Sequence, residues 1–220
     1  MAKFNLTSTN TTAVTRLQPW TINEVVLKGV ELKTGTSKEG NNWKAIQFKF
    51  AGNGGIFEPM IFCPKEDGGD VRPSGESNGR RWEMPSALEQ LQFTIAHIVG
   101  TLVPSNFEKL QKISLELPAE FDKLVDTVKK ALAPAFNKST NIKLIGDNRG
   151  YAAIPNFINI NKDSGEAYIS NNWIGDNLAF SAYEIKKMEA AKNAKPTEVS
   201  EAPADDIDSS DDNNDLDFDI

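Results

Sequence analysis

The pattern of the chain changes twice, from strand-like to helical and back, and this order constrains its fold more than any other feature. Strand-like stretches lie within residues 22–63, helical stripes within residues 86–132, and strand-like stretches return from residue 141. The stretch from Trp43 to Ala51 is the clearest, because apolar residues alternate with others, as in a strand with one buried face. The order therefore predicts an α+β fold that is mainly β.

Two of the early stretches contain residues that interrupt a regular strand. Gly29 stands within residues 22–34, where we expect a sharp bend, and Pro59 indicates an edge strand or a bulge in residues 56–63. Between them, alternation divides one strand into two faces. The apolar face holds Ile46, Phe48 and Phe50, and the outward face holds Trp43, Ala45, Gln47 and Lys49.

Helical residues separate the early strands from the late ones. Ser86 and Glu89 have the spacing of a capping box at the start of a helix, and Pro104 is expected to end it. A further helix is predicted between Pro118 and Pro134. Strands, helices and strands in this order are expected of a Greek-key barrel of the OB type, with a helical insertion between strands 3 and 4.

The later part of the chain predicts hairpins and a final helix. Tight turns at residues 147–150 and 162–165 each separate two short strand-like stretches. Ser181 and Glu184 have the spacing of a second capping box. Residues 64–83, by contrast, form a long break in the pattern, and a loop of that length is usually functional or disordered.

The two parts of the chain carry net charges of opposite sign. Residues 198–220 hold ten acids and no Lys or Arg, whereas residues 1–197 hold 24 basic and 21 acidic side chains, a net charge of +3. We therefore expect a flexible arm at residues 1–18, one domain at residues 19–195 and a disordered acidic tail at residues 196–220. The positive body can attract a polyanion although the whole chain has a net charge of −7.

Apolar side chains alternate with aspartates at the end of the tail, so an extended strand would place the apolar ones on one side. A tail that only keeps the protein soluble remains an alternative, but it would not need these apolar groups. The predicted partner-binding residues are Asp215, Leu216, Asp217, Phe218, Asp219 and Ile220.

Several classes of protein lack support in the sequence. No signal peptide or stretch of ~18 apolar residues is present, so we expect a cytoplasmic protein without a membrane partner. Cys63 is the only cysteine, and His97, the only histidine, falls in a helical apolar stripe and is interpreted as structural. Glu-x-Lys triplets at Glu31 and Glu184 are the only trace of a metal-dependent nuclease. We predict no enzyme, with no catalytic residue, metal or cofactor.

The chain contains more of the residues that nucleic-acid binding needs, because aromatic rings stack on bases while cations follow the phosphates of a single strand. Three clusters combine the two, although Trp43 could instead cap the barrel and Trp82 could anchor the next helix. The predicted nucleic-acid-binding residues are Lys33, Lys38, Trp43, Lys44, Lys49, Arg80, Arg81, Trp82, Arg149 and Tyr151.

The terminal sequence DLDFDI after an aspartate-rich run resembles the tails of bacterial and phage single-stranded DNA-binding proteins, and the body is most similar to the form found in T7-like phages. This resemblance implies an OB barrel that coats and protects single-stranded DNA during replication, recombination and repair in the host cytoplasm. It also implies that the tail recruits polymerase, helicase or primase and competes with DNA for the cleft. Here Phe218 is followed by Asp219 and Ile220, whereas family tails usually end on the aromatic residue or a Pro-Phe pair.

One alternative from another class remains, an acidic-tailed chaperone or decoy for basic proteins. Binding to single-stranded oligonucleotides distinguishes the two hypotheses. The sequence leaves the oligomeric state and the preference for DNA over RNA open.

Overall fold

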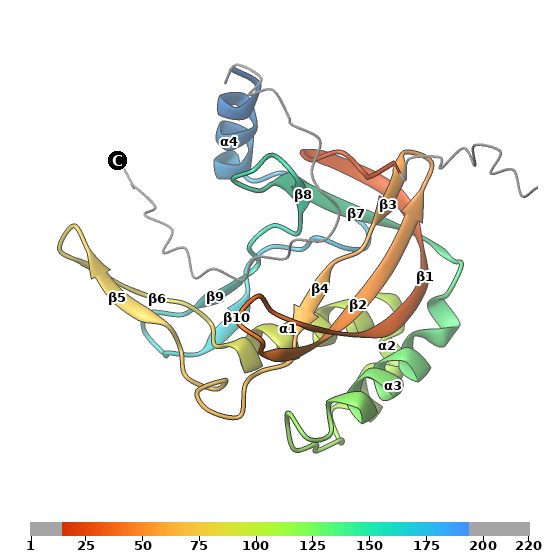
Figure 1. Cartoon of the computed structure of the whole chain (residues 1–220). Coiled ribbons are helices and arrows are strands. Elements are labelled where there is room, and N and C mark those ends of the chain that lie inside the picture. The colour runs from red at the N-terminus through yellow and green to blue at the C-terminus, as the bar shows by residue number, and fades with distance from the viewer. Residues whose placement is uncertain (1–14, 194–220) are drawn as a thin grey trace, which may run out of the picture.

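The computed structural model describes residues 15–193, and one antiparallel sheet organises them. The sheet curls into a nearly closed barrel with the strand order β3-β2-β1-β7-β8, and β4 also pairs with β2 (Figure 1). Its strands are β1 (Thr21–Thr36), β2 (Asn42–Gly52), β3 (Gly55–Phe57), β4 (Met60–Phe62), β7 (Ser139–Gly146) and β8 (Ala152–Ala153). The prediction of a mainly β fold with helices is confirmed.

The expected irregularities of the early strands are present. The register between β1 and β2 shifts between Leu27 and Gly29, which marks a bulge in the long first strand. The segment 56–63 forms two short strands rather than one, because Glu58 and Pro59 separate β3 from β4. Phe48 still donates its backbone N–H to the Pro59 carbonyl at 3.1 Å, so the interruption stays attached to the sheet.

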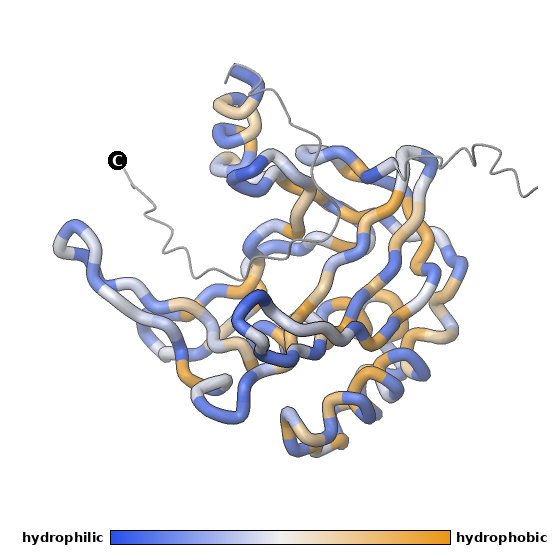
Figure 2. Tube along the Cα trace, viewed as in Figure 1, coloured by the Kyte–Doolittle hydropathy of each residue, from blue (hydrophilic) through white to orange (hydrophobic). Residues whose placement is uncertain are grey.

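The apolar face of β2 lines the core as predicted. Ile46 and Phe48 are 0% exposed, and Phe50 is 1% exposed. On the outward face, however, Ala45 and Gln47 are also buried, so the surface of this strand is not open along its whole length. Figure 2 shows hydrophobic residues along the barrel strands and along the helices that cover them.

Three helices pack together against one side of the barrel (Figure 1). They are α1 (Ala87–Leu102), α2 (Pro104–Leu110) and α3 (Phe121–Leu132), and a 3₁₀ turn (Ala133–Ala135) follows. Ser86 accepts the amide N–H of Glu89, whose carboxylate accepts the amide N–H of Ser86, so the capping box is confirmed. These helices lie in sequence between the early strands and β7, where the strand pattern predicted helical material.

The long break at residues 64–83 is partly a hairpin, which the sequence did not predict. Its strands are β5 (Ser74–Ser77) and β6 (Arg80–Glu83), and the hairpin projects from the body with a hydrophilic tip (Figures 1 and 2). Arg72 fixes its base, donating to Glu89 at 2.6 Å, to Glu83 at 3.2 Å and to the Gly165 carbonyl at 2.6 Å. Gly165 lies in the turn of the predicted hairpin β9 (Ile158–Ile160) and β10 (Ala167–Ile169).

The last described helix, α4 (Ala182–Asn193), is tied to the barrel by a buried ion pair. Lys143 in β7 is fully buried and donates to Glu184 at 3.1 Å, to Asn171 at 2.7 Å and to the Ala179 carbonyl at 2.8 Å. Glu184 and Ser181 also exchange the two hydrogen bonds of the predicted capping box. Burial raises the pKa of Glu184, but the Ser181 amide and the Lys143 ammonium together hold it below its ordinary value.

The structured part begins earlier than the sequence indicated. Residues 15–18 belong to the predicted flexible arm, yet Leu17 is 3% exposed and donates its backbone N–H to the Ile56 carbonyl in β3, while the Ile56 N–H donates to the Thr15 carbonyl. The rest of that arm, residues 1–14, and the tail at 196–220 with its predicted partner-binding residues lie outside the described residues. No helix within residues 15–193 is long and apolar enough to cross a membrane.

Candidate functional site

Trp43 occupies the edge of the barrel face formed by β1 and β2. It pairs across the strands with Gly35, and its indole lies over that glycine so closely that a Cβ at residue 35 would overlap the ring. A larger residue at position 35 would therefore force the indole to move. The ring is half-buried, so it neither enters the core nor stands free in solvent.

Phe62 in β4 extends this aromatic surface, although it was not among the predicted site residues. Its ring centroid lies 5.5 Å from that of Trp43 with an interplanar angle of 76°, and Phe62 is 41% exposed. The β2–β4 register explains the orientation of Phe62. Ile61 pairs with the inward-facing Ile46, so the next residue along β4 must point outward. A half-buried tryptophan and an exposed phenylalanine therefore form an aromatic pair on the outer side of the sheet.

Lys33 and Lys49 lie on the same face of the sheet as Trp43 according to the β1–β2 register. Glu31 stands between the two lysines, 2.7 Å from the Lys49 ammonium and 3.4 Å from that of Lys33. The hydrogen bond from Lys49 is the main reason why the pKa of Glu31 lies below its ordinary value. Both cations remain partly exposed, so an incoming anion can compete with Glu31 for them.

The structure does not place the Lys44 side chain on the same face of β2 as Trp43. Lys44 lies near the start of β2 and follows its inward phase, and its ammonium lies 2.7 Å from Asp122 in α3. The alternation of β2 contained this information, because Lys44 and Ile46 are two residues apart. Lys38 is exposed in the turn that joins β1 to β2.

The β5–β6 hairpin repeats the pairing of tryptophan with glycine. Trp82 pairs across the strands with Gly75, its indole lies over that glycine, and 41% of the residue is exposed. Arg80 shares the face of Trp82, whereas Arg81 points to the opposite face and pairs with Glu76. The predicted Arg-Arg-Trp cluster is therefore divided between two faces of the hairpin.

Arg149 and Tyr151 are brought together, but away from Trp43. The Arg149 guanidinium lies 5.7 Å from the Tyr151 ring centroid and 3.5 Å from Asp147. Their turn follows β7, which pairs with the first residues of β1, whereas the β1–β2 turn follows the last residues of β1. Since β1 has 16 residues, the two turns lie near opposite ends of that strand.

Chemically, the β1–β2–β4 face offers the surfaces of two aromatic rings and two partly exposed ammonium groups. His97 offers no catalytic group there, because it is buried against Phe157 and Trp173, and burial holds its pKa below the ordinary value. No cluster of three or more His, Cys, Asp or Glu side chains in residues 15–193 is arranged to hold a metal ion. The arrangement is suited to binding an anionic polymer whose flat groups can stack on the aromatic rings.

Comparison with known protein families, with curated proteins and with solved structures finds no match to this chain.

Proposed function

We propose that this protein binds single-stranded DNA without sequence preference. The observation that carries the proposal is the contact between the half-buried Trp43 ring and the exposed Phe62 ring, on the same barrel face as Lys33 and Lys49. Aromatic rings stack on any base and lysines pair with the phosphates, so this combination is tolerant of sequence. Trp82 and Arg80 on the projecting hairpin provide a second surface of the same composition.

The fold is in keeping with this assignment. We assign the barrel to the Greek-key OB type, with α1–α3 inserted between the strands that correspond to its third and fourth. In barrels of that type the first-to-second-strand turn and the outer face of the second strand line the usual binding cleft. Trp43 and Lys49 belong to that strand, and Lys38 belongs to that turn.

The proposed biological setting follows from the tail. The chain would act as a phage-type single-stranded DNA-binding protein in replication, recombination and repair in the host cytoplasm. Its acidic tail would compete with DNA for the cationic face and recruit polymerase, helicase or primase through Leu216, Phe218 and Ile220. The support is the tail's ten carboxylates and their alternation with apolar groups at the tip.

Fluorescence anisotropy of a labelled oligo(dT) tests the binding site. Trp43→Ala should weaken binding by about 1–3 kcal/mol, which is roughly five- to 150-fold. Tyr183→Ala is a matched control, because Tyr183 is 55% exposed with Lys187 5.6 Å away, but it lies on α4. Absence of binding by the wild-type protein at low salt would reject the function. Equal affinities for wild type and Trp43→Ala would reject the site.

A second experiment tests the tail. Deleting residues 198–220 should tighten DNA binding most at low salt, where the carboxylates compete best with phosphates. Phe218→Ala changes no charge, so it should leave DNA affinity unchanged while reducing capture of the polymerase. An unchanged DNA affinity after the deletion would rule out competition, and equal polymerase capture by wild type and Phe218→Ala would rule out recruitment through the tip.

A further inference from the structure

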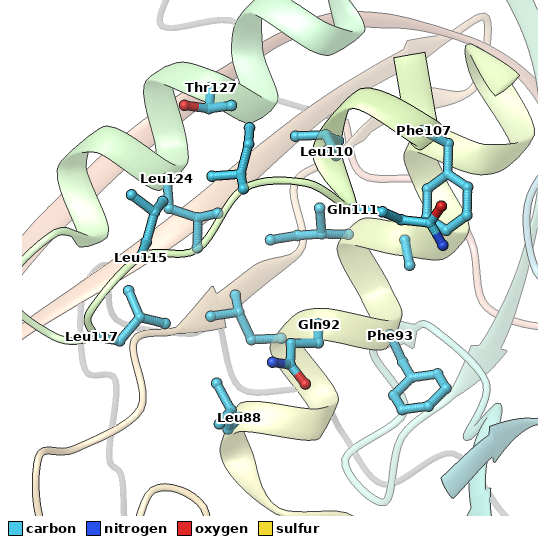
Figure 3. A pocket seen from close by; sticks show the side chains of 14 residues that line it. Leu88, Gln92, Phe93, Phe107, Leu110, Gln111, Leu115, Leu117, Leu124 and Thr127 are labelled. Carbon is cyan, nitrogen blue, oxygen red and sulfur yellow. The ribbon is translucent and has the colours of Figure 1, made fainter. Parts of the chain in front are cut away.

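An apolar groove of about 590 Å³ opens between α1, α2 and α3. Its walls come from all three helices and from the segment that connects α2 to α3 (Figure 3). The side chains that form the walls include Leu88, Phe93, Phe107, Leu110, Leu115 and Leu124. These residues are only partly buried, so the groove leaves apolar surface in contact with solvent.

The groove selects its occupant by apolar contact rather than by charge. Residues 104–132, which form two of its walls, hold five acidic and five basic side chains. Several of these charges already have partners, as Lys123 pairs with Glu120 at 2.5 Å and Asp122 pairs with Lys44. An occupant with apolar groups on one side and charges on the other can therefore bury its apolar groups in the groove, and its charges meet no net charge of the same sign on these walls.

The chain itself contains a segment of that kind. Leu216, Phe218 and Ile220 alternate with Asp217 and Asp219, so an extended segment directs three apolar side chains to one side and two carboxylates to the other. The volume of the groove lies in the range that takes a few side chains of this size. We propose that the groove between α1, α2 and α3 binds residues 216–220 of the same chain.

The length of chain outside the described residues permits this contact. From Asn193, the last residue of α4, to Leu216 there are 23 residues, which can span up to about 80 Å when extended. A compact domain of this size has a radius of gyration of about 16 Å, so half its circumference is roughly 65 Å. The tip can thus reach the groove from any point on the surface, and its tether keeps its local concentration high.

This contact would control the availability of the tip. A partner protein that binds Phe218 could not reach it until the tip leaves the groove. This consequence rests on the recruitment proposed above. The docking itself does not depend on DNA binding. The remaining acids of the tail, residues 198–214, stay able to compete for the cationic barrel face while the tip is held elsewhere.

Photo-crosslinking of the full-length chain, with p-benzoylphenylalanine in place of Phe218, tests the proposal in the absence of DNA. Crosslinked peptides identified by mass spectrometry should contain residues of α1, α2, α3 or their connections. An equal mixture of ¹⁵N-labelled and unlabelled chains should give crosslinks within one isotopic form only. Crosslinks to the β1–β2 face, between isotopic forms, or to no part of the body would each overturn the proposal.

A matched pair of variants tests whether the groove is responsible. Ile113 lines the groove and Ile22 lies on β1, and both are 44% exposed, so replacing either should disturb the fold little. Ile113→Gln removes apolar wall without adding charge and should lower the crosslink yield roughly fivefold. Ile22→Gln should leave the yield unchanged. Equal yields from the two variants would contradict docking in this groove.

Discussion

Neutralising Glu31 should strengthen DNA binding if the β1–β2 face is the binding site. The Glu31 carboxylate lies between the Lys33 and Lys49 ammonium groups, at 3.4 and 2.7 Å. It therefore occupies the position that we propose for a phosphate. Glu31→Gln keeps the size of the side chain and removes its charge, so the two lysines become available to DNA without a competitor.

The size of the effect follows from the exposure of these groups. All three side chains are between 31% and 44% exposed, so each pair contributes only about 0.2–1 kcal/mol in water. In Glu31→Gln a phosphate no longer has to displace these ion pairs. The repulsion between the Glu31 carboxylate and that phosphate, about 0.7 kcal/mol at ~6 Å in water, is also removed. The sum predicts a gain of about 1–2 kcal/mol, or roughly five- to thirtyfold tighter binding at low salt.

Titrations of labelled oligo(dT) over a range of salt concentrations measure this gain. The ratio of affinities should approach one near 1 M salt, where the Debye length is about 3 Å. Glu108→Gln is the control, because it makes the same change in net charge on α2. Equal affinities of wild type and Glu31→Gln at low salt would refute the reasoning, and so would an equal gain from Glu108→Gln, which would assign the effect to net charge alone.

Three further substitutions test the structure around the site. Lys143→Met should lower the free energy of unfolding by about 3–5 kcal/mol in urea titrations, because Glu184 loses its buried cation, and adding Glu184→Gln should recover part of that loss. The melting temperature should fall from pH 7.5 to 5.5, because burial holds the pKa of His97 in the folded protein below 6.5. The contribution of the neutral His97 to the stability of the fold is therefore present above pH 6.5 and is lost as the pH falls through the folded pKa. His97→Gln should lack this part of the pH dependence. Gly35→Ala should displace the overlying indole, alter tryptophan emission and weaken DNA binding, whereas Gly29→Ala, whose Cβ would meet no atom within 4 Å, should do neither.

Much of the secondary structure could be predicted because its causes are local. A capping box joins residues three apart, and a strand repeats every two residues, so both patterns are visible in a short window. Ser86 and Glu89 form the predicted capping box, and β2 is a strand with a buried apolar face, although Ala45 and Gln47 on its outward face are buried as well. The β5–β6 hairpin escaped prediction because its strands have four residues each and are mostly exposed, which leaves no apolar period to detect.

The candidate site could be predicted only in part. Composition indicated Trp43, Lys33 and Lys49, and the structure places them on one face. The structure places Lys44 on the other side of β2, paired with Asp122, as the period of β2 already indicated. Phe62 needed the pairing of β4 with β2, which joins segments about 15 residues apart and cannot be read from either segment alone.

The sequence by itself determined the succession of strands and helices, the separation of charge between body and tail, and the apolar alternation at the end of the chain. These properties depend on residue type and on neighbours a few positions away. Only the tertiary structure decided which cations share a face, how Arg72 joins the hairpin to α1, and that three helices leave an apolar groove. The physical reason is that pairing register and helix packing are set by the burial of side chains from distant segments in one core.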